Sequence, residues 1–270
     1  MSFGKTILIR VAALAEFRTG RPNTTLDAMK AFIVDAFTDQ PFKGNPAGVC
    51  LSDASLPNDR MLSIAHELNL SETAFVHPSA NEIYTIRYFS PEMEIPLCGY
   101  ATMAAAQVLF ELFNLGDVTS RTDANLELVA RRIEDCIEMV FPVYETSPAQ
   151  ASSALLDALG LTSIVNAAFN RETKILLLEI ADAKTLAELR PDYQALLASH
   201  NAINGVLVTA PSDTKSHDFH SRYFWPWSGT DEDPVTGGTC TFLAKYWATR
   251  LGKTKLRSFQ SSRRTGAMEL

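Results

Sequence analysis

A carboxylate flanked by small hydroxyl side chains is the feature of this sequence with the clearest chemical potential. Glu72 lies between Ser71 and Thr73, where a polar turn leads into an apolar run through Phe75 and Val76. Neighbouring hydroxyls can orient such a carboxylate, and burial can raise its pKa toward neutral pH, as a general acid/base requires. Glu72 could instead cap an element or face solvent, and this stretch alone favours that plainer interpretation.

Two distant stretches repeat one pattern, and each ends with glycine at the start of an apolar helix. Residues 87–89 and 222–224 both read Arg-Tyr-Phe, and an acidic loop containing proline comes after each. The first loop ends at Gly99 and the second at Gly237 and Gly238. Helix N-termini present free N–H groups and a positive dipole end, so two of them facing one cleft would bind a carboxylate or stabilise an enolate. The glycines could also serve only tight packing, but the duplication favours a binding site.

The pattern along the chain predicts two domains after an extension. Residues 1–28 lack a pattern that continues into the strand beginning near Phe32, which predicts an extension or linker outside the core; a transit peptide is the alternative, since Lys and Arg outnumber Asp and Glu there. Residues 29–146 predict an N-terminal domain of strands and helices. Two prolines within 142–148 mark the boundary, and residues 147–270 repeat the same order of elements as a C-terminal domain.

Composition narrows the class of protein. The chain has 270 residues, 46% of them hydrophobic, and a formal net charge of −7, which predicts a soluble core and argues against a nucleic-acid binder. Its apolar runs are too short for a membrane span. The four cysteines lie far apart and the five histidines are scattered, so neither a metal site nor a disulfide framework is expected. This cysteine usage indicates a reducing compartment and a cytoplasmic location.

Six stretches carry a resemblance to a known family. In chain order they are Asp-Ala-Phe-Thr at 35–38, Gly-Asn-Pro-Ala-Gly-Val at 44–49, Leu-Ser-Glu-Thr-Ala-Phe at 70–75, Arg-Tyr-Phe-Ser-Pro at 87–91 with Glu94, Leu-Cys-Gly-Tyr-Ala-Thr at 97–102 and Glu-Asp-Pro-Val-Thr-Gly at 232–237. From about residue 29 to its end the chain resembles the PhzF-like isomerase family of phenazine biosynthesis, which has the diaminopimelate-epimerase-like fold. The resemblance implies an α+β protein with two pseudo-repeated domains, each a barrel-like, mostly antiparallel sheet around a central helix, with the active site between them.

The resemblance also implies an activity and a set of site residues. It implies a cofactor-independent isomerase that shifts a proton on a small carboxylate-bearing substrate. The composition adds the expectation of no nucleic acid and no membrane as partner, and a homodimer is a further expectation. Glu72 matches the family's catalytic acid/base. Asp233 matches an acid that positions the substrate or relays the proton. The implied substrate-binding residues are Asn45, Gly99, Tyr100, Gly237 and Gly238.

The chain departs from the family pattern at the site and at its end. The family usually has His at the position of Tyr100, Ser at Gly238, and often Ala-His at 239–240, where this chain has Thr-Cys. Tyrosine can donate a hydrogen bond but is neutral at pH 7. The family also usually continues for another strand or two beyond Leu270, so the C-terminal domain is expected to stop inside its final hairpin.

Two other classes of function remain alternatives to the isomerase. Related epimerases on this fold use two facing cysteines, and Cys98 lies at the start of the first apolar helix. The matching position in the second half is Thr236, with Cys240 about one turn later, so a mechanism with one carboxylate is the preferred interpretation. An amino-acid epimerase or racemase remains one alternative. A non-catalytic binding or interaction protein, to which the changes at Tyr100 and Gly238 point, is the other.

Overall fold

The structure is a computed structural model that describes residues 5–9, 11–18 and 29–270. The chain divides into two compact units, here called the N-unit (Thr6–Val140) and the C-unit (which contains Phe141–Leu270). The division falls shortly before the predicted boundary at residue 146. Within the described residues, no helix combines the length and the apolar character that crossing a bilayer takes.

The N-unit contains one curled, mixed sheet. Its strands are β2 (Val11–Arg18), β3 (Lys30–Ala36), β4 (Asn45–Leu51), β5 (Thr73–Pro78), β6 (Ile83–Phe89), β7 (Glu94–Ile95), β8 (Asp117–Arg121), β9 (Glu127–Ile133) and β10 (Cys136–Phe141). The order is β2–β3–β4–β5–β6–β8–β9–β10, with β7 paired to β6. The β4–β5 and β6–β8 pairs are parallel and the others are antiparallel.

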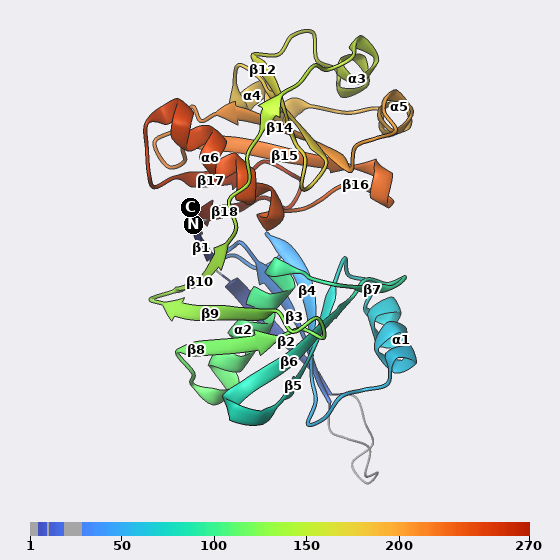
Figure 1. Cartoon of the computed structure of the whole chain (residues 1–270), viewed down its shortest axis with the longest axis vertical. Coiled ribbons are helices and arrows are strands. Elements are labelled where there is room, and N and C mark those ends of the chain that lie inside the picture. Colours follow the sequence, from blue (N-terminus) through green and yellow to red (C-terminus); the bar gives the residue numbers. More distant parts are fainter. Residues whose placement is uncertain (1–4, 10, 19–28) are drawn as a thin grey trace. The chain divides into compact units, whose positions relative to one another are not determined.

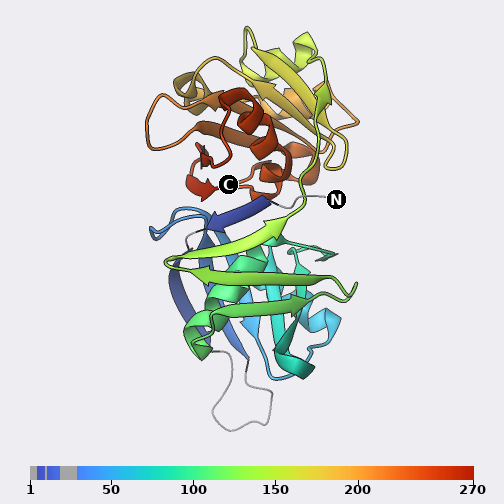
Figure 2. The same cartoon turned by 60° about the vertical axis from the view of Figure 1, so that its left-hand side comes forward.

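Two α-helices pack on opposite faces of this sheet. α1 (Asn58–Leu68) buries Met61 and Ala65 against Phe75 and Phe89 in one apolar cluster. α2 (Gly99–Phe113) runs through the curl of the sheet and contacts β3, β4, β5, β8 and β9 (Figures 1 and 2). Because strands surround α2, its middle is apolar on every side, and its many alanines let the strands approach closely.

The C-unit repeats this arrangement. Its strands are β11 (Ser147–Pro148), β12 (Asn166–Asn170), β13 (Ile175–Glu179), β14 (Gly205–Pro211), β15 (Phe219–Trp225), β16 (Thr230–Glu232), β17 (Arg257–Gln260) and β18 (Gly266–Glu269). The order is β11–β12–β13–β14–β15–β17–β18, with β16 paired to β15. As in the N-unit, one antiparallel pair separates the two pairs of parallel strands.

The C-unit contains several α-helices, and the last of them is the counterpart of α2. They are α3 (Ser153–Leu159), α4 (Ala183–Glu188), α5 (Tyr193–Ser199) and α6 (Cys240–Leu251), and the short turn η3 (Gly237–Thr239) leads into α6. α6 packs Phe242 and Trp247 against Leu207 of β14 and Tyr223 of β15. The structure therefore confirms the predicted α+β fold with a curled sheet around a central helix in each half.

The predicted extension at residues 1–28 is covered only in part, because residues 1–4, 10 and 19–28 lie outside what the structure describes. The described part forms β1 (Lys5–Ile9) and β2. β2 pairs with β3 from Val11 opposite Ala36 to Arg18 opposite Lys30. Removal of β2 would leave N–H and C=O groups of β3 without these partners. That residues 1–28 lie outside the core stays a prediction, and this ladder counts against it.

Two local sequence patterns, at residues 44–48 and at the C-terminus, can be compared with the structure. The glycines and proline at 44–48 predict a turn, but β4 already begins at Asn45, and only Gly44 has a left-handed backbone (φ 66°). A Cβ at Gly44 would lie 2.0 Å from the carbonyl oxygen of Ala36, so only glycine fits. At the C-terminus β17 and β18 form an antiparallel pair, and Leu256 and Leu270 exchange backbone hydrogen bonds of 2.9 and 2.8 Å. That the domain stops inside its final hairpin stays a prediction.

Candidate active site

Glu72 lies immediately before β5, at the end of the parallel β4–β5 ladder. Its carbonyl oxygen accepts a hydrogen bond of 3.0 Å from the N–H of Gly48. A Cβ at Gly48 would come within 2.6 Å of the Thr73 hydroxyl, so the strands can approach this closely only because residue 48 is glycine. The backbone of Glu72 is thus fixed by regular strand pairing rather than by a loop.

The side chain of Glu72 is half-buried and meets the first turn of α2. The Tyr100 hydroxyl donates a hydrogen bond to Oε2 of Glu72. Burial raises the pKa of the Glu72 carboxyl above its ordinary value, and the Tyr100 hydrogen bond lowers that pKa in part. A carboxyl group with a raised pKa, held by one donor, can both take up and release a proton near neutral pH.

The start of α2 is built from backbone and hydroxyl contacts. Cys98 is the N-cap residue, and no side chain caps the helix there. The Thr102 hydroxyl donates to the Cys98 carbonyl (2.8 Å) and lies 2.5 Å from the Tyr88 hydroxyl. Burial raises the pKa of Tyr88, so this phenol stays neutral. The positive end of the α2 dipole therefore lies beside Glu72 without a carboxylate cap from the helix itself.

Backbone strain lies next to this site. Phe37 is 1% exposed and has φ 68°, a left-handed conformation that is costly for a bulky residue. Its ring centroid lies 6.2 Å from that of Tyr100. Asn45, fully buried, comes shortly afterwards at the start of β4. Residues held in such conformations concentrate at functional sites, which supports this end of the N-unit as the site.

The second candidate acid lies in the C-unit at the start of the corresponding helix. Asp233 Oδ2 accepts a hydrogen bond of 2.5 Å from the Thr236 hydroxyl. Gln260 fixes this loop from β17, because its amide donates to the Asp233 carbonyl (2.8 Å) and accepts from the Thr236 N–H (2.9 Å). Gly237 and Gly238 come directly after this loop, and a Cβ at Gly238 would meet nothing within 4 Å.

The structure places the predicted site residues in two groups. Glu72 and Tyr100 touch, with Gly99 beside Tyr100 at the start of α2; Asp233 lies with the two glycines at the start of η3. That both groups serve one substrate stays a prediction. Sequence reasoning missed the roles of Thr102 and Gln260, which hold the two helix starts. Thr102 lies inside the matched stretch at 97–102, whereas Gln260 lies in none.

The cysteines do not form a matched pair. Cys98 and Cys240 are buried, and Thr236 rather than cysteine occupies the helix start in the C-unit. Burial raises the pKa of the Cys240 thiol to about 12, and this thiol donates to the Met268 sulfur at 3.7 Å. Such a thiol is inert as an acid/base at neutral pH. Among residues 5–9, 11–18 and 29–270, no three His, Cys, Asp or Glu side chains converge on a common point.

Two half-barrels of the same topology, each around an apolar helix with an acid at its start, define the diaminopimelate-epimerase-like class of fold. A predicted epimerase from Pseudomonas aeruginosa shares this fold, with a TM-score of 0.63 at 20% identity over 88% of this chain and 90% of that one. The family model for phenazine biosynthesis-like proteins matches residues 34–270. The chain belongs to the phenazine biosynthesis-like (PhzF) family.

Individual relatives agree with this assignment. An uncharacterized isomerase of Pseudomonas aeruginosa is 44% identical over 239 residues, which covers 88% of this chain and 89% of that protein. A phenazine biosynthesis-like domain-containing protein of Rattus norvegicus is 38% identical over 259 residues, covering 88% and 90%. The crystal structure of a PhzF family protein of Enterococcus faecalis has a TM-score of 0.82 at 35% identity, covering 90% of this chain and 95% of that one.

Proposed function

We propose that this protein is a cofactor-independent isomerase that shifts a proton between two positions of a small, carboxylate-bearing molecule. The observation that carries the proposal is the half-buried Glu72 carboxyl, which has a raised pKa and accepts a hydrogen bond from Tyr100 at the start of α2. Membership of a family in which a relative is named an isomerase supports the same reaction class.

In the proposed reaction, ionised Glu72 removes a proton from an activated carbon of the substrate. The electron pair of the broken C–H bond is delocalised toward the substrate's carboxylate or a conjugated double bond. Backbone N–H groups at the start of α2 stabilise that developing negative charge. Protonated Glu72 then returns the proton to a different carbon, which completes the isomerisation without net oxidation or reduction.

Tyr100 has a positioning role in this proposal. It lies on Oε2 of Glu72, which leaves Oε1 for the substrate proton. Its hydrogen bond favours the ionised form of Glu72 and so keeps the base available as pH falls. A neutral phenol performs both tasks without adding a positive charge.

Asp233 is proposed as the second acid, which positions the substrate or relays the proton. The Thr236 hydroxyl donates to one carboxylate oxygen of Asp233 and so fixes the orientation of this side chain at the helix start. Asn45, Gly99, Gly237 and Gly238 complete the proposed substrate-binding set.

A binding protein without turnover is the second candidate, and the open space at Gly238 favours it. A substrate anchored by a hydroxyl at this helix start would find only a backbone N–H there. Such a protein would bind small carboxylic acids and exchange none of their C–H protons with solvent.

The proposed reaction also sets the expected partners and location. We expect a small-molecule substrate, no nucleic acid or membrane, and a homodimer. The four cysteines are free thiols, as suits the reducing cytoplasm.

Proton exchange tests the proposal. Small cyclic and amino carboxylic acids would be screened by thermal shift, and those that bind would be incubated with the protein in heavy water and monitored by NMR. Glu72→Gln should keep binding and lower the exchange rate about 10²- to 10⁴-fold. Glu67→Gln, which changes an exposed carboxylate on α1, is the matched control and should exchange at the unmodified rate.

The outcomes separate the two candidates. A bound acid that exchanges protons at the same rate with Glu72→Gln would refute Glu72 as the acid/base. Binding without any exchange by the unmodified protein would establish the binding protein instead.

A further inference from the structure

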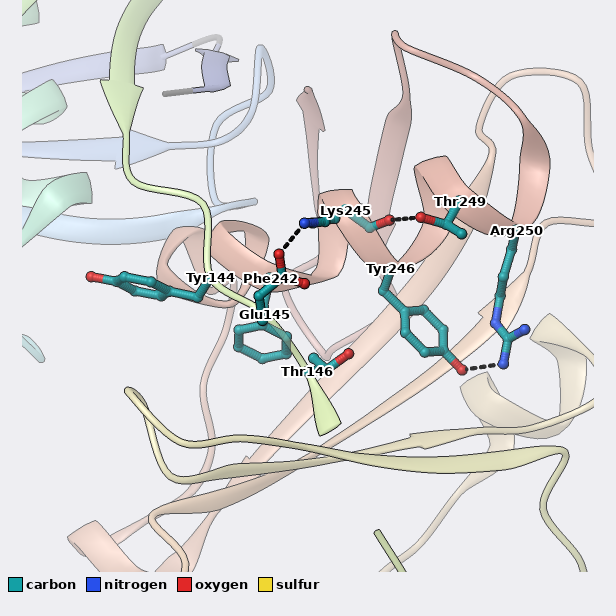
Figure 3. Close-up of a pocket in the computed structure, with 8 residues that line it drawn as sticks. All are labelled: Tyr144, Glu145, Thr146, Phe242, Lys245, Tyr246, Thr249 and Arg250. Atoms are coloured by element: carbon teal, nitrogen blue, oxygen red, sulfur yellow. Dashed lines mark hydrogen bonds and ion pairs between the residues drawn. The ribbon is translucent and has the colours of Figure 1, made fainter. Parts of the chain in front are cut away.

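A pocket on the C-unit has neither candidate acid in its lining. It has a volume of about 250 Å³ between the outer face of α6 and the chain that precedes β11 (Figure 3). Phe242 lies beside this chain, Tyr246 extends from α6 toward Arg250, and Lys245 pairs with Glu145. The pocket therefore combines aromatic, hydroxyl and guanidinium side chains in its lining, and one ion pair lies at its edge.

The pocket exists because the two units differ beside their central helices. In the N-unit, β2 is eight residues long, and α2 contacts both β2 and β3. In the C-unit the equivalent strand β11 has only two residues, so less sheet covers α6. Counting from the paired glycines Gly99 and Gly237, buried Val108 corresponds to Tyr246, and Gln107 corresponds to Lys245. The open face of α6 is thus both more aromatic and more charged than its counterpart.

Hydrogen bonds at its hydroxyl group hold the Tyr246 side chain in place. Its hydroxyl donates to Glu179 (2.5 Å) and accepts from Asn166 (2.9 Å) and Arg250 (2.7 Å). Arg250 also pairs with Glu179 at 2.6 Å and lies over the Tyr246 ring at 4.5 Å. All hydrogen-bonding capacity of this hydroxyl is used and Arg250 covers one face of the ring, so the ring offers a ligand only its other, apolar face.

The ion pair at the edge is free to rearrange. The side chains of Lys245 and Glu145 are 46% and 74% exposed, and a pair this exposed contributes little to stability. A ligand can therefore separate the two charges at little cost, provided that it supplies each of them with a new partner.

We propose that this pocket binds a free α-amino acid with an aromatic side chain. The ligand's carboxylate would pair with Lys245, and its ammonium group would pair with Glu145, so no charge is left without a partner. The side chain would lie against Tyr246 in the interior. A cavity of about 150 Å³ suffices for benzene in a protein interior, so this pocket has room for a benzyl or phenol group.

Zwitterion recognition distinguishes this ligand from simpler ones. A carboxylic acid without the amine would leave Glu145 facing a displaced anion, and an amine without the carboxylate would leave Lys245 facing a cation. Either ligand leaves one charge unsatisfied that the zwitterion would satisfy. The site is thus expected to select the amino acid over both analogues.

Titration calorimetry with L-phenylalanine, 3-phenylpropionate and 2-phenylethylamine tests the proposal on the whole chain. L-Phenylalanine should bind at least about tenfold more tightly than either analogue, because each analogue lacks one charged hydrogen-bonding group. Lys245→Gln and Glu145→Gln should each weaken L-phenylalanine by a similar factor. Lys253→Gln, which removes an exposed lysine paired with Asp218 elsewhere on the C-unit, is the matched control and should bind normally.

A charge-reversed double variant, Lys245→Glu with Glu145→Lys, should recover binding, since the two partners only exchange places. Loss of L-phenylalanine binding in Glu72→Gln, but not in the Lys245 variant, would place the ligand at the proposed active site and overturn the inference. No binding of L-phenylalanine, or equal binding of all three compounds, would also overturn it. The result does not depend on catalysis, so the proposed isomerase activity can fail while this site stands.

Discussion

The N-unit and the C-unit share one strand order but differ in the groups that could do chemistry. In the N-unit, Glu72 comes one residue before the residue that pairs with Phe89 on the neighbouring strand. In the C-unit, Gly205 comes one residue before the residue that pairs with Phe224. Those two positions are therefore equivalent. The ring of Tyr223 covers Gly205, so the C-unit has packed side chain where the N-unit has its acid. The repeat preserves the scaffold and leaves this acid in one copy only.

The support beneath both helix starts is the part that the units share. Arg87 binds Glu94 through two hydrogen bonds of 2.8 and 2.6 Å, and Arg222 binds Glu232 through two of 2.7 and 2.8 Å. Each pair ties the strand that carries Arg-Tyr-Phe to the short strand before the helix. Bidentate pairs fix direction as well as distance, so each loop enters its helix along a fixed path.

After Glu94 and Glu232, the two units again have different residues at equivalent positions. Asp233 falls where the N-unit has Ile95, and Gly238 falls where it has Tyr100. Each unit thus carries one acid at a position where the other carries a residue without a charge. Substitutions at the paired positions can test whether the two units divide the chemistry in this way.

The largest effect is expected at Asp233. Asp233→Asn keeps the shape and a hydrogen bond to Thr236 but removes the charge, and should slow proton exchange about 10²- to 10⁴-fold if Asp233 handles the proton. The rate would be measured by NMR in heavy water on a substrate found in the screen. Asp231→Asn, two residues earlier and exposed, is the matched control. Unchanged exchange would mean that the N-unit acts alone.

The shared arginines should differ in their contribution to stability. Arg222 is 7% exposed and also donates to the carbonyls of Leu186 and Leu189 at 3.2 and 2.9 Å, at the end of α4. Arg222→Met should therefore lower the free energy of unfolding by about 3–5 kcal/mol, the usual loss when one partner of a buried pair is removed.

The equivalent change in the N-unit should cost less. Arg87 is 12% exposed and its partner Glu94 is 37% exposed, so water can replace part of the lost contact. Arg87→Met should lower the free energy of unfolding by about 1–3 kcal/mol. Urea unfolding of both variants, monitored by circular dichroism, gives the two values. Equal losses would show that the α4 carbonyls add nothing to the Arg222 site.

Much of the fold could be predicted from local patterns, and much of the site could not. The repeated Arg-Tyr-Phe segments and the glycines at 99 and 237 mark elements that form from nearby residues, so their places were predictable. The contact of Tyr100 with Glu72 depends on how α2 docks against β5, and no local pattern encodes that. The resemblance predicts that Tyr100 binds substrate, which stays a prediction; in the structure its hydroxyl donates to Glu72, which the resemblance did not predict.

The sequence patterns predict neither the pairing of β2 with β3 nor the pocket beside α6, and the reasons are similar. Strand pairing between β2 and β3 joins segments separated by residues 19–29, and the mixed charges of the first segment hid its strand pattern. The pocket arises from the brevity of β11, which no composition rule predicts. Both features depend on strand length and register rather than on residue type.

A substitution at Gly205 tests whether packing keeps a side chain out of the C-unit position that is equivalent to Glu72. A Cβ at Gly205 would lie 2.6 Å from the ring of Tyr223, which is 4% exposed and has little room to move. Gly205→Ala should lower the free energy of unfolding by about 1–3 kcal/mol, as overpacked cores do. Thermal and urea unfolding measure the loss. A variant as stable as the parent would show that the C-unit could have kept a side chain at the position of Glu72.

The pH dependence of stability tests Glu72 itself. Burial raises the folded-state pKa of Glu72 above the ordinary 4.5, so between these two values the folded protein binds more protons than the unfolded chain. The free energy of unfolding therefore falls as pH rises through that window. Glu72→Gln removes this contribution, so the variant should gain stability relative to the parent on going from below pH 4.5 to neutral pH. Glu67→Gln controls for the loss of one charge; a Glu72→Gln difference that stays flat with pH would contradict the raised pKa.

The smallest effect is expected at Gly238, the C-unit position equivalent to Tyr100. A Cβ there meets nothing within 4 Å, and Gly238 does not have the left-handed backbone that favours glycine. Gly238→Ser should therefore change the free energy of unfolding by no more than about 0.5 kcal/mol. It adds a hydroxyl beside Asp233, so any gain in substrate affinity would come from that group and not from a change in fold. If Gly238→Ser destabilises the protein as much as Gly205→Ala, then the helix start of the C-unit is as tightly packed as the position that replaced the acid, and the open space at Gly238 cannot be part of a binding site.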